Sequence, residues 1–181
     1  MRPQVDRLFF ALRPERERAH AIVAWSEQAL GTGWELQSAE RLHVTLAITD
    51  DVGHDASPEL ITSMAAIGER VAAEPFTLCL DKLVLTGRSA ALRPSRGNAG
   101  LRALNRSIRA AMENMRVSLR DKWAFSPHMT LGYRKGPPME QPAPRQEWLV
   151  EDFVLIRSLV GRTRHVAHGR WPLRPIQYTL F

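Results

Sequence analysis

The spacing of apolar residues predicts three helices separated by strand-like segments. Apolar side chains recur every three or four positions, as on one face of a helix, in three stretches: residues 15–30, 57 to about 73, and about 99 to 119. Gly31 suits the end of the first helix, and Ser57 followed by Pro58 suits the start of the second.

Shorter apolar runs between these stretches predict strands. They lie at residues 5–12, 42–49, 75–86, 90–93, 128–133, 148–159 and in parts of 170–181. The segment GPPMEQPAP, residues 136–144, is rich in proline, which cannot donate a backbone hydrogen bond, and it predicts a surface loop.

The order of these elements can be divided into two comparable halves. Each half has a long helix followed by a strand with the same short motif, although the halves share little sequence outside that motif. This order predicts an α+β protein with two lobes related by pseudo-twofold symmetry. We expect residues 1–181 to form a single bilobal domain.

The composition is that of a globular protein, with 44% hydrophobic and 24% charged residues. No apolar run approaches the ~20 residues that cross a bilayer, and the apolar stretch near the N-terminus is too short for a signal peptide. The single cysteine, Cys79, excludes an internal disulfide and is expected in a buried strand. We expect a cytoplasmic protein.

The net charge is +6 and the isoelectric point is about 10.4. Such a balance favours a polyanionic partner, for example a nucleic acid. However, only three of the 25 basic residues are lysines, and so many arginines can equally reflect biased genome composition. Charge alone leaves both interpretations open.

Two of the six histidines stand in the same frame, His-apolar-Thr-Leu. His43 lies in RLHVTLAIT and His128 in SPHMTLGYR, whereas the other four have no threonine two positions later. Side chains alternate between the faces of a strand, so each motif has a polar face and an apolar face. The polar faces hold His43, Thr45 and Ala47 in the first copy, and His128, Thr130 and Gly132 in the second.

Two histidines that face one cleft can act as a general acid and a general base near neutral pH. The threonine hydroxyls beside them can donate hydrogen bonds to charged oxygens, for which phosphate is the natural candidate. In-line displacement at phosphorus needs this arrangement, because one histidine takes a proton from water while the other gives a proton to the leaving oxygen.

Other uses of the histidines are less well supported. Hydrolytic zinc sites usually need three protein ligands, and neither motif has a neighbouring carboxylate or cysteine. Serine-nucleophile and nucleotide-loop motifs are absent from the sequence. A lone His-x-Thr would best be read as a hydrogen-bonded strand residue, but the duplication argues against that reading here.

The segments LHVTL and PHMTL resemble the two HxTx signatures of the two-histidine (2H) phosphoesterase superfamily. Together with the opening RLFFAL and the closing FVLIRSLVGRTRHVAHGRWPL, they look like the bacterial RNA 2',3'-cyclic phosphodiesterases, once called 2'-5' RNA ligases. The resemblance covers nearly the whole chain, from about residue 7 to 173. It implies a bilobal α+β fold with antiparallel sheets flanking a central cleft, helices outside, and no metal or other cofactor.

The reaction implied by the resemblance opens a terminal 2',3'-cyclic phosphate of RNA to leave a 2'-phosphate, with reverse 2'-5' ligation in vitro as a further capacity. His43 would give the proton to the departing 3'-oxygen, and His128 would activate water. Thr45 and Thr130 would hold the phosphate, and Arg134 is a further candidate for substrate binding. We expect a monomer that binds RNA ends or nucleotides carrying the cyclic phosphate.

Other residues are less clearly assigned. His165 stands where relatives often have tyrosine, and we interpret it as a surface residue, with a third catalytic group as the alternative. His168 is expected to face solvent. Aromatic side chains can stack on the bases of RNA ends but are more often part of a core; the candidates are Phe9, Phe10, Trp123 and Phe125.

Two rival functions remain open from the sequence. One is a module that binds RNA ends with little catalysis, and the other is a cyclic phosphodiesterase that acts on a small nucleotide. Intact histidines and threonines in both motifs favour an enzyme.

Overall fold

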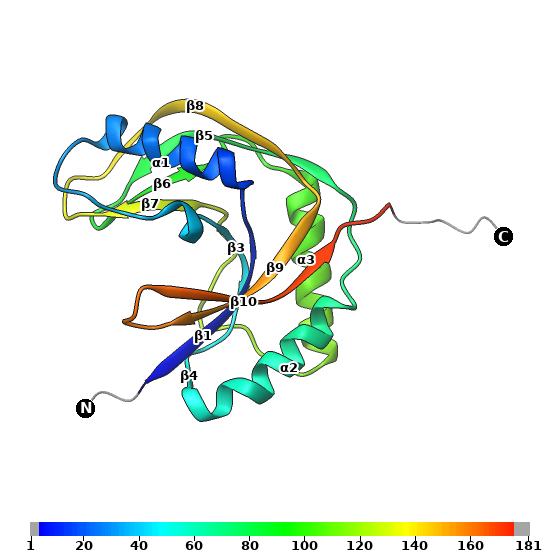
Figure 1. The fold of residues 1–181 in the computed structure, drawn as a ribbon. Coiled ribbons are helices and arrows are strands. Elements are labelled where there is room, and N and C mark those ends of the chain that lie inside the picture. Colours follow the sequence, from blue (N-terminus) through cyan, green and yellow to red (C-terminus); the bar gives the residue numbers. More distant parts are fainter. Residues whose placement is uncertain (1–3, 176–181) are drawn as a thin grey trace.

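The computed structural model describes residues 4–175 (Figure 1). Its helices, strands and two short 3-10 helices follow in this order: β1 (Val5–Leu12), α1 (Arg16–Leu30), β2 (Glu35–Leu36), η1 (Ala39–Arg41), β3 (Val44–Ile48), β4 (Val52–Gly53), η2 (His54–Ala56), α2 (Ser57–Gly68), β5 (Phe76–Leu85), β6 (Ser89–Arg93), α3 (Ala99–Asn114), β7 (Met129–Tyr133), β8 (Met139–Val150), β9 (Asp152–Leu159) and β10 (Arg164–Pro172).

The strands form one open antiparallel sheet in the order β10-β9-β1-β3-β7-β6-β5-β8, with β4 paired to β1 and β2 to β7. Its two halves, β10-β9-β1-β3 and β7-β6-β5-β8, meet at a single register pair, Val44 with Met129. In chain order, the strand, long helix and motif strand β1, α1 and β3 correspond to β6, α3 and β7. The predicted α+β class and its pseudo-twofold order are confirmed.

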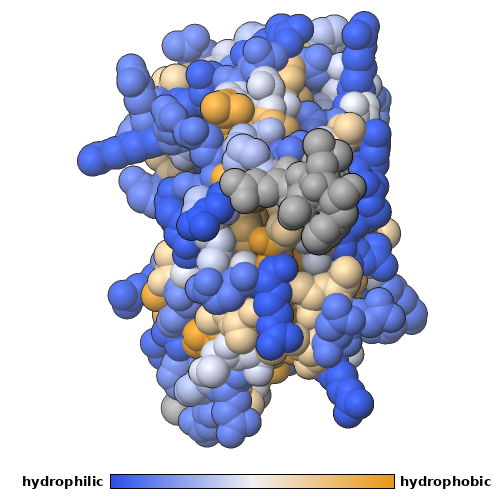
Figure 2. All heavy atoms as spheres, turned by 90° about the vertical axis from the view of Figure 1, so that its right-hand side faces the viewer, coloured by the Kyte–Doolittle hydropathy of each residue, from blue (hydrophilic) through white to orange (hydrophobic). Residues whose placement is uncertain are grey.

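The helices cover the sheet on its outside. In Figure 1, α2 and α3 lie side by side, with α2 in contact with β9 and β10 and α3 in contact with β3 and β5. Leu101, Leu104 and Ile108 of α3 are buried, as its apolar spacing predicts. Figure 2 shows that the face on this side is largely hydrophilic, with apolar side chains in small groups. None of the helices in residues 4–175 has the length and apolarity to span a membrane.

Two helices end about five residues earlier than the spacing predicts. The predicted third helix reaches residue 119, but α3 ends at Asn114 because Arg116 adopts a left-handed φ of 56°. The Val117 amide then donates to the Met112 carbonyl at 2.9 Å, which closes the helix end. Similarly, α2 ends at Gly68 instead of continuing to about residue 73.

The prediction of a loop over the proline cluster is wrong for most of its length. Residues 136–138 form a loop, but β8 begins at Met139 and includes Pro142 and Pro144. This strand pairs only with β5 and forms an edge of the sheet. A proline is tolerated there because an edge strand has backbone positions without a partner, and the pairing is irregular beside Pro142.

The predicted strand over residues 148–159 is two strands that belong to opposite halves of the sheet. The chain leaves β8 at Val150 and enters β9 at Asp152, so Glu151 is the crossing between the halves. The expected strand character in 170–181 is found in β10 up to Pro172, and residues 176–181 lie outside the described part of the chain.

The leucine of each motif forms a β-bulge. In β3 the register passes from Thr45 to Ala47 and skips Leu46, and in β7 it passes from Thr130 to Gly132 and skips Leu131. A bulge inserts one extra residue and changes the face of every later side chain. The alternation predicted from the sequence is therefore wrong after the leucine in both copies.

Gly132, just after the second bulge, provides a test of how tightly β2 packs on β7. A Cβ at this position would lie 2.8 Å from the Glu35 carbonyl oxygen, which is backbone and cannot move alone. We expect Gly132→Ala to lower the free energy of unfolding in urea by about 1–3 kcal/mol. Gly87→Ala is the control, since nothing lies within 4 Å of its added Cβ; equal stability of the two variants would contradict the packing.

Candidate active site

The two motifs line one cleft with a volume of about 370 Å³. The cleft brings together His43, Thr45, His128 and Thr130, as predicted. Its other lining residues come from the ends of β3 and β7, from β1, β9 and β10, from the segments around β2 and η1, and from the loop after α3: Arg7, Phe9, Gln37, Arg41, Ile48, Arg120, Trp123, Ala124, Ser126, Tyr133, Ser158 and His165.

Each motif histidine is held by the backbone two residues before it. His43 Nδ1 lies 2.6 Å from the Arg41 carbonyl oxygen, and His128 Nδ1 lies 2.7 Å from that of Ser126. A carbonyl oxygen only accepts, so Nδ1 carries the proton in both rings. Nε2 is then the nitrogen left to exchange protons with a ligand in the cleft.

The threonine hydroxyls are free to bind a ligand. Neither Thr45 nor Thr130 makes a side-chain hydrogen bond to another residue in the described part of the chain. Both side chains are half-buried and line the cleft beside the histidines. They can therefore donate to the oxygens of an anion such as phosphate.

The bulges bring two unexpected side chains into the cleft. Simple alternation assigns Ile48 and Tyr133 to the apolar faces, but both line the cleft because the skipped leucine reverses their direction. Ala47, expected on the ligand side, is buried in the main core. Ile48 packs instead with Phe9 and Val154 in a separate apolar cluster.

Two of the arginines that line the cleft, Arg7 and Arg120, are paired with carboxylates. Asp51 accepts from Arg7 Nε at 2.8 Å and from Arg7 Nη2 at 2.9 Å, and it also accepts from Arg120. The hydrogen bond from Arg7 lowers the pKa of Asp51. Arg120 Nε also lies 3.9 Å from Asp50 Oδ1. Two carboxylates therefore largely balance the charges of these two arginines.

Arg41 adds a third cation to this surface. It forms no ion pair within residues 4–175, and its buried Nε has no hydrogen-bond partner there. A desolvated guanidinium with unfilled donors suits an anionic oxygen.

The two motif histidines have different surroundings. The His43 ring lies against the Phe9 ring, with 4.9 Å between centroids, and edge-on to His165 at 5.3 Å. Burial lowers the pKa of His43 to about 4. The imidazole of His43 is therefore neutral near pH 7 in the free protein. His128 has no ring contact of this kind among the described residues.

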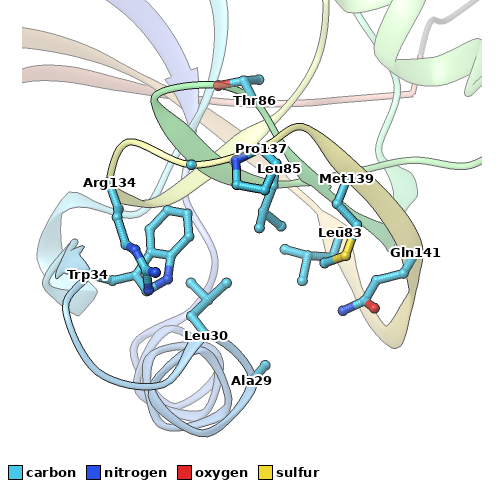
Figure 3. Close-up of a pocket in the computed structure, with 11 residues that line it drawn as sticks. Ala29, Leu30, Trp34, Leu83, Leu85, Thr86, Arg134, Pro137, Met139 and Gln141 are labelled. Atoms are coloured by element: carbon cyan, nitrogen blue, oxygen red, sulfur yellow. The ribbon is translucent and has the colours of Figure 1, made fainter.

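Arg134, predicted to bind substrate, does not line this cleft. It lies beyond the end of β7 and lines a separate pocket of about 300 Å³ (Figure 3). Its Nη1 donates to the Thr32 carbonyl at 3.2 Å, and its guanidinium lies 5.7 Å from the centre of the Trp34 ring. These contacts hold it on the α1 side of the sheet, so Arg7, Arg41 and Arg120 are the cations of the cleft.

The interpretation of His165 as a surface residue is wrong. Its ring lines the cleft and lies edge-on to both His43 and Phe9, with 5.6 Å between the His165 and Phe9 centroids. His168, expected to face solvent, is half-buried, and its buried Nε2 has no partner among the described residues. The sequence gives no direct signal for His165, because strand β10 approaches His43 only through the pairing of β9 with β1.

The aromatic candidates divide between cleft and core. Trp123 lines the cleft and is half-buried, so its ring is accessible to a ligand. Phe9 lines the cleft too but is only 3% exposed and packs on His43. Phe10 is fully buried, and Phe125 packs against the main core. Within residues 4–175, no three histidine, cysteine or acidic side chains are grouped as a metal site requires.

Comparison with known proteins gives a consistent picture. A sequence model of the family described as the 2'-5' RNA ligase superfamily matches residues 14–162. No curated protein matches the chain in a sequence search.

Solved structures with this fold include E. coli LigT in apo form, with a TM-score of 0.78 and 23% identity over 95% of this chain and 99% of that one. E. coli LigT complexed with ATP has a TM-score of 0.70 and 25% identity over 96% and 99%. A structure described as a phosphoesterase has a TM-score of 0.70 and 26% identity over 96% and 99%.

The half-buried position of His43 beside the cleft predicts that its protonation depends on a bound anion. In histidine NMR spectra of the free protein, His43 should titrate near pH 4 with the proton on Nδ1. Saturating inorganic phosphate should raise this pKa, because a negative charge nearby favours the imidazolium. Chloride at equal ionic strength is the control; a pKa that stays near 4 with phosphate bound would contradict binding beside His43.

Proposed function

Because this chain belongs to the 2'-5' RNA ligase superfamily, we propose that it is a metal-independent RNA 2',3'-cyclic phosphodiesterase. It opens a terminal 2',3'-cyclic phosphate by hydrolysis and leaves a 2'-phosphate. The observation that carries this proposal is the meeting of both motifs in one cleft, each histidine held through Nδ1 with Nε2 left for proton transfer.

In the proposed reaction, water attacks phosphorus on the side of His128, whose Nε2 accepts the water proton. The bond from phosphorus to the 3'-oxygen breaks on the opposite side, and His43 gives its Nε2 proton to that oxygen. Thr45 and Thr130 donate to the non-bridging oxygens. The proton balance is closed, since the proton taken by one histidine replaces the proton given by the other.

His43 must carry a second proton to act as the acid. Burial holds its pKa at about 4 in the free protein, so this proton has to be taken up with the anionic substrate. Arg41, which forms no ion pair within residues 4–175, balances the phosphate charge without acting as an acid, because a guanidinium stays protonated.

The cleft favours RNA over a small nucleotide as substrate. Its basic side chains extend beyond the four motif residues, which suits more than one phosphate. Among the relatives, LigT has been crystallised with ATP, a small nucleotide, so a mononucleotide is the substrate to compare with RNA. We propose that the two sheet halves are lobes of one domain, since the site needs a motif from each. We also propose that the protein acts in the cytoplasm.

The activity is tested with a chelator present. The protein is incubated with a 2',3'-cyclic mononucleotide and with an oligonucleotide that ends in the cyclic phosphate, and the phosphate position in each product is identified. We expect a 2'-phosphate and faster turnover of the oligonucleotide. Turnover of neither would refute the enzyme and leave an RNA-end binding module, while turnover of the mononucleotide alone would support a small-nucleotide enzyme.

Replacement of either histidine should remove most of the activity. We expect His43→Ala and His128→Ala each to lower kcat by about 10²–10⁴-fold, the usual contribution of a general acid or base, with unchanged circular dichroism. His20→Ala, on the exposed face of α1, is the control and should keep full activity.

The two roles can be separated with a substrate that has sulfur in place of the 3'-oxygen. A thiolate leaves without a proton, so this substrate should restore the activity of His43→Ala but not of His128→Ala. Rescue of His128→Ala instead would reverse the assignment of acid and base.

The threonines should act on the phosphate independently of proton transfer. Thr45→Val and Thr130→Val keep the shape of the side chain but remove the hydroxyl, and we expect each to lower kcat/KM by about tenfold or more. The pH profile should keep its shape. Activity equal to that of the unmodified protein in both variants would show that the hydroxyls do not contact the phosphate.

A further inference from the structure

His165 forms part of the cleft wall on the His43 side. It lies on β10 opposite Ser158 of β9, and both residues line the cleft. The His165 and His43 ring centroids are 5.3 Å apart, so a ligand that reaches the His43 ring is also within reach of His165. The corresponding wall beside His128 has no third imidazole among the described residues.

The two ring nitrogens of His165 differ in their surroundings. Nδ1 is buried and has no hydrogen-bond partner within residues 4–175. Nε2 is not among the buried side-chain atoms that lack a partner there. A buried N–H without a partner is rarer and more costly than a buried lone pair. The tautomer with its proton on Nε2 is therefore favoured, and it presents an N–H donor to the cleft.

The His165 ring is neutral near pH 7. Burial, and secondarily the neighbouring His43, lowers the pKa of His165 to about 3. A neutral ring whose cleft-facing nitrogen already carries a proton cannot act as the base. It can donate one hydrogen bond to an oxygen acceptor.

We propose that His165 is a specificity residue that donates from Nε2 to an oxygen on the sugar side of the bound nucleotide. This inference rests on the proposed function, in which His43 protonates the 3'-oxygen and the ribose therefore lies on the His43 side of phosphorus. His165 contacts the nucleoside part of the ligand and not the phosphate. Its ring also packs on His43 through edge-on contact.

The affinities for two probes distinguish contacts with the phosphate from the contact of His165 with the nucleoside. Inorganic phosphate reports the histidine and threonine contacts alone, and adenosine 2'-monophosphate adds the sugar and base. His165→Phe keeps a ring against Phe9 and His43 but removes both nitrogens, and His165→Gln restores an N–H donor. His20→Phe, exposed on α1, is the matched control, and thermal melting verifies that each variant folds.

We expect His165→Phe to weaken adenosine 2'-monophosphate binding by about 3- to 10-fold, the usual loss for one hydrogen bond, and to leave phosphate binding unchanged. His165→Gln should recover most of the nucleotide affinity. Equal weakening for both probes would overturn the proposal and assign His165 to the packing of His43. No change for either probe would also overturn it.

The outcomes also separate this inference from the reaction itself. A protein that turns over the cyclic phosphate but binds nucleotide equally well with His165→Phe refutes the role of His165 alone. A protein without turnover whose nucleotide binding depends on His165 supports the contact and refutes the reaction. If the unmodified protein binds nucleotide no more tightly than phosphate, the role of His165 is refuted, and turnover of the cyclic phosphate decides the reaction separately.

Discussion

The pairing of Val44 with Met129 is the contact on which the candidate site depends. It is the one register pair between the motif strands, and each partner directly follows a motif histidine. Because both residues are fully buried, their neighbours in the chain point to the opposite face of the sheet. Two segments far apart in the sequence are thus brought to one cleft by packing in the core.

The sequence was sufficient to predict the elements whose causes are local. The strand β1 is found at its predicted bounds, and α3 begins at Ala99, close to the predicted start. Asn98 caps this helix start, with its Oδ1 accepting from the Leu101 amide at 2.8 Å. Errors arose where a distant partner decides the outcome. Pro142 and Pro144 lie in a strand because this segment pairs with β5 at the edge of the sheet. The sequence of a proline-rich segment does not show that such a partner strand lies beside it.

Within the site, the motif predicted His43, Thr45, His128 and Thr130 but not the residues around them. The bulges at Leu46 and Leu131 are backbone features, and they place Ile48 and Tyr133 in the cleft against their sequence alternation. Arg134 was predicted from the family resemblance, because many members have an arginine soon after the second motif. Its contacts with Thr32 and Trp34 hold it elsewhere, and no local pattern encodes them.

The pseudo-twofold fold places two similar motifs in equivalent positions, whereas an acid and a base require different surroundings. Both histidines have the same backbone hydrogen bond, so the difference must come from outside the motifs. Phe9 and His165 enclose His43 and desolvate it, and they belong to β1 and β10, at opposite ends of the chain. The pairing of β9 with both of these strands therefore breaks the symmetry that the motifs share.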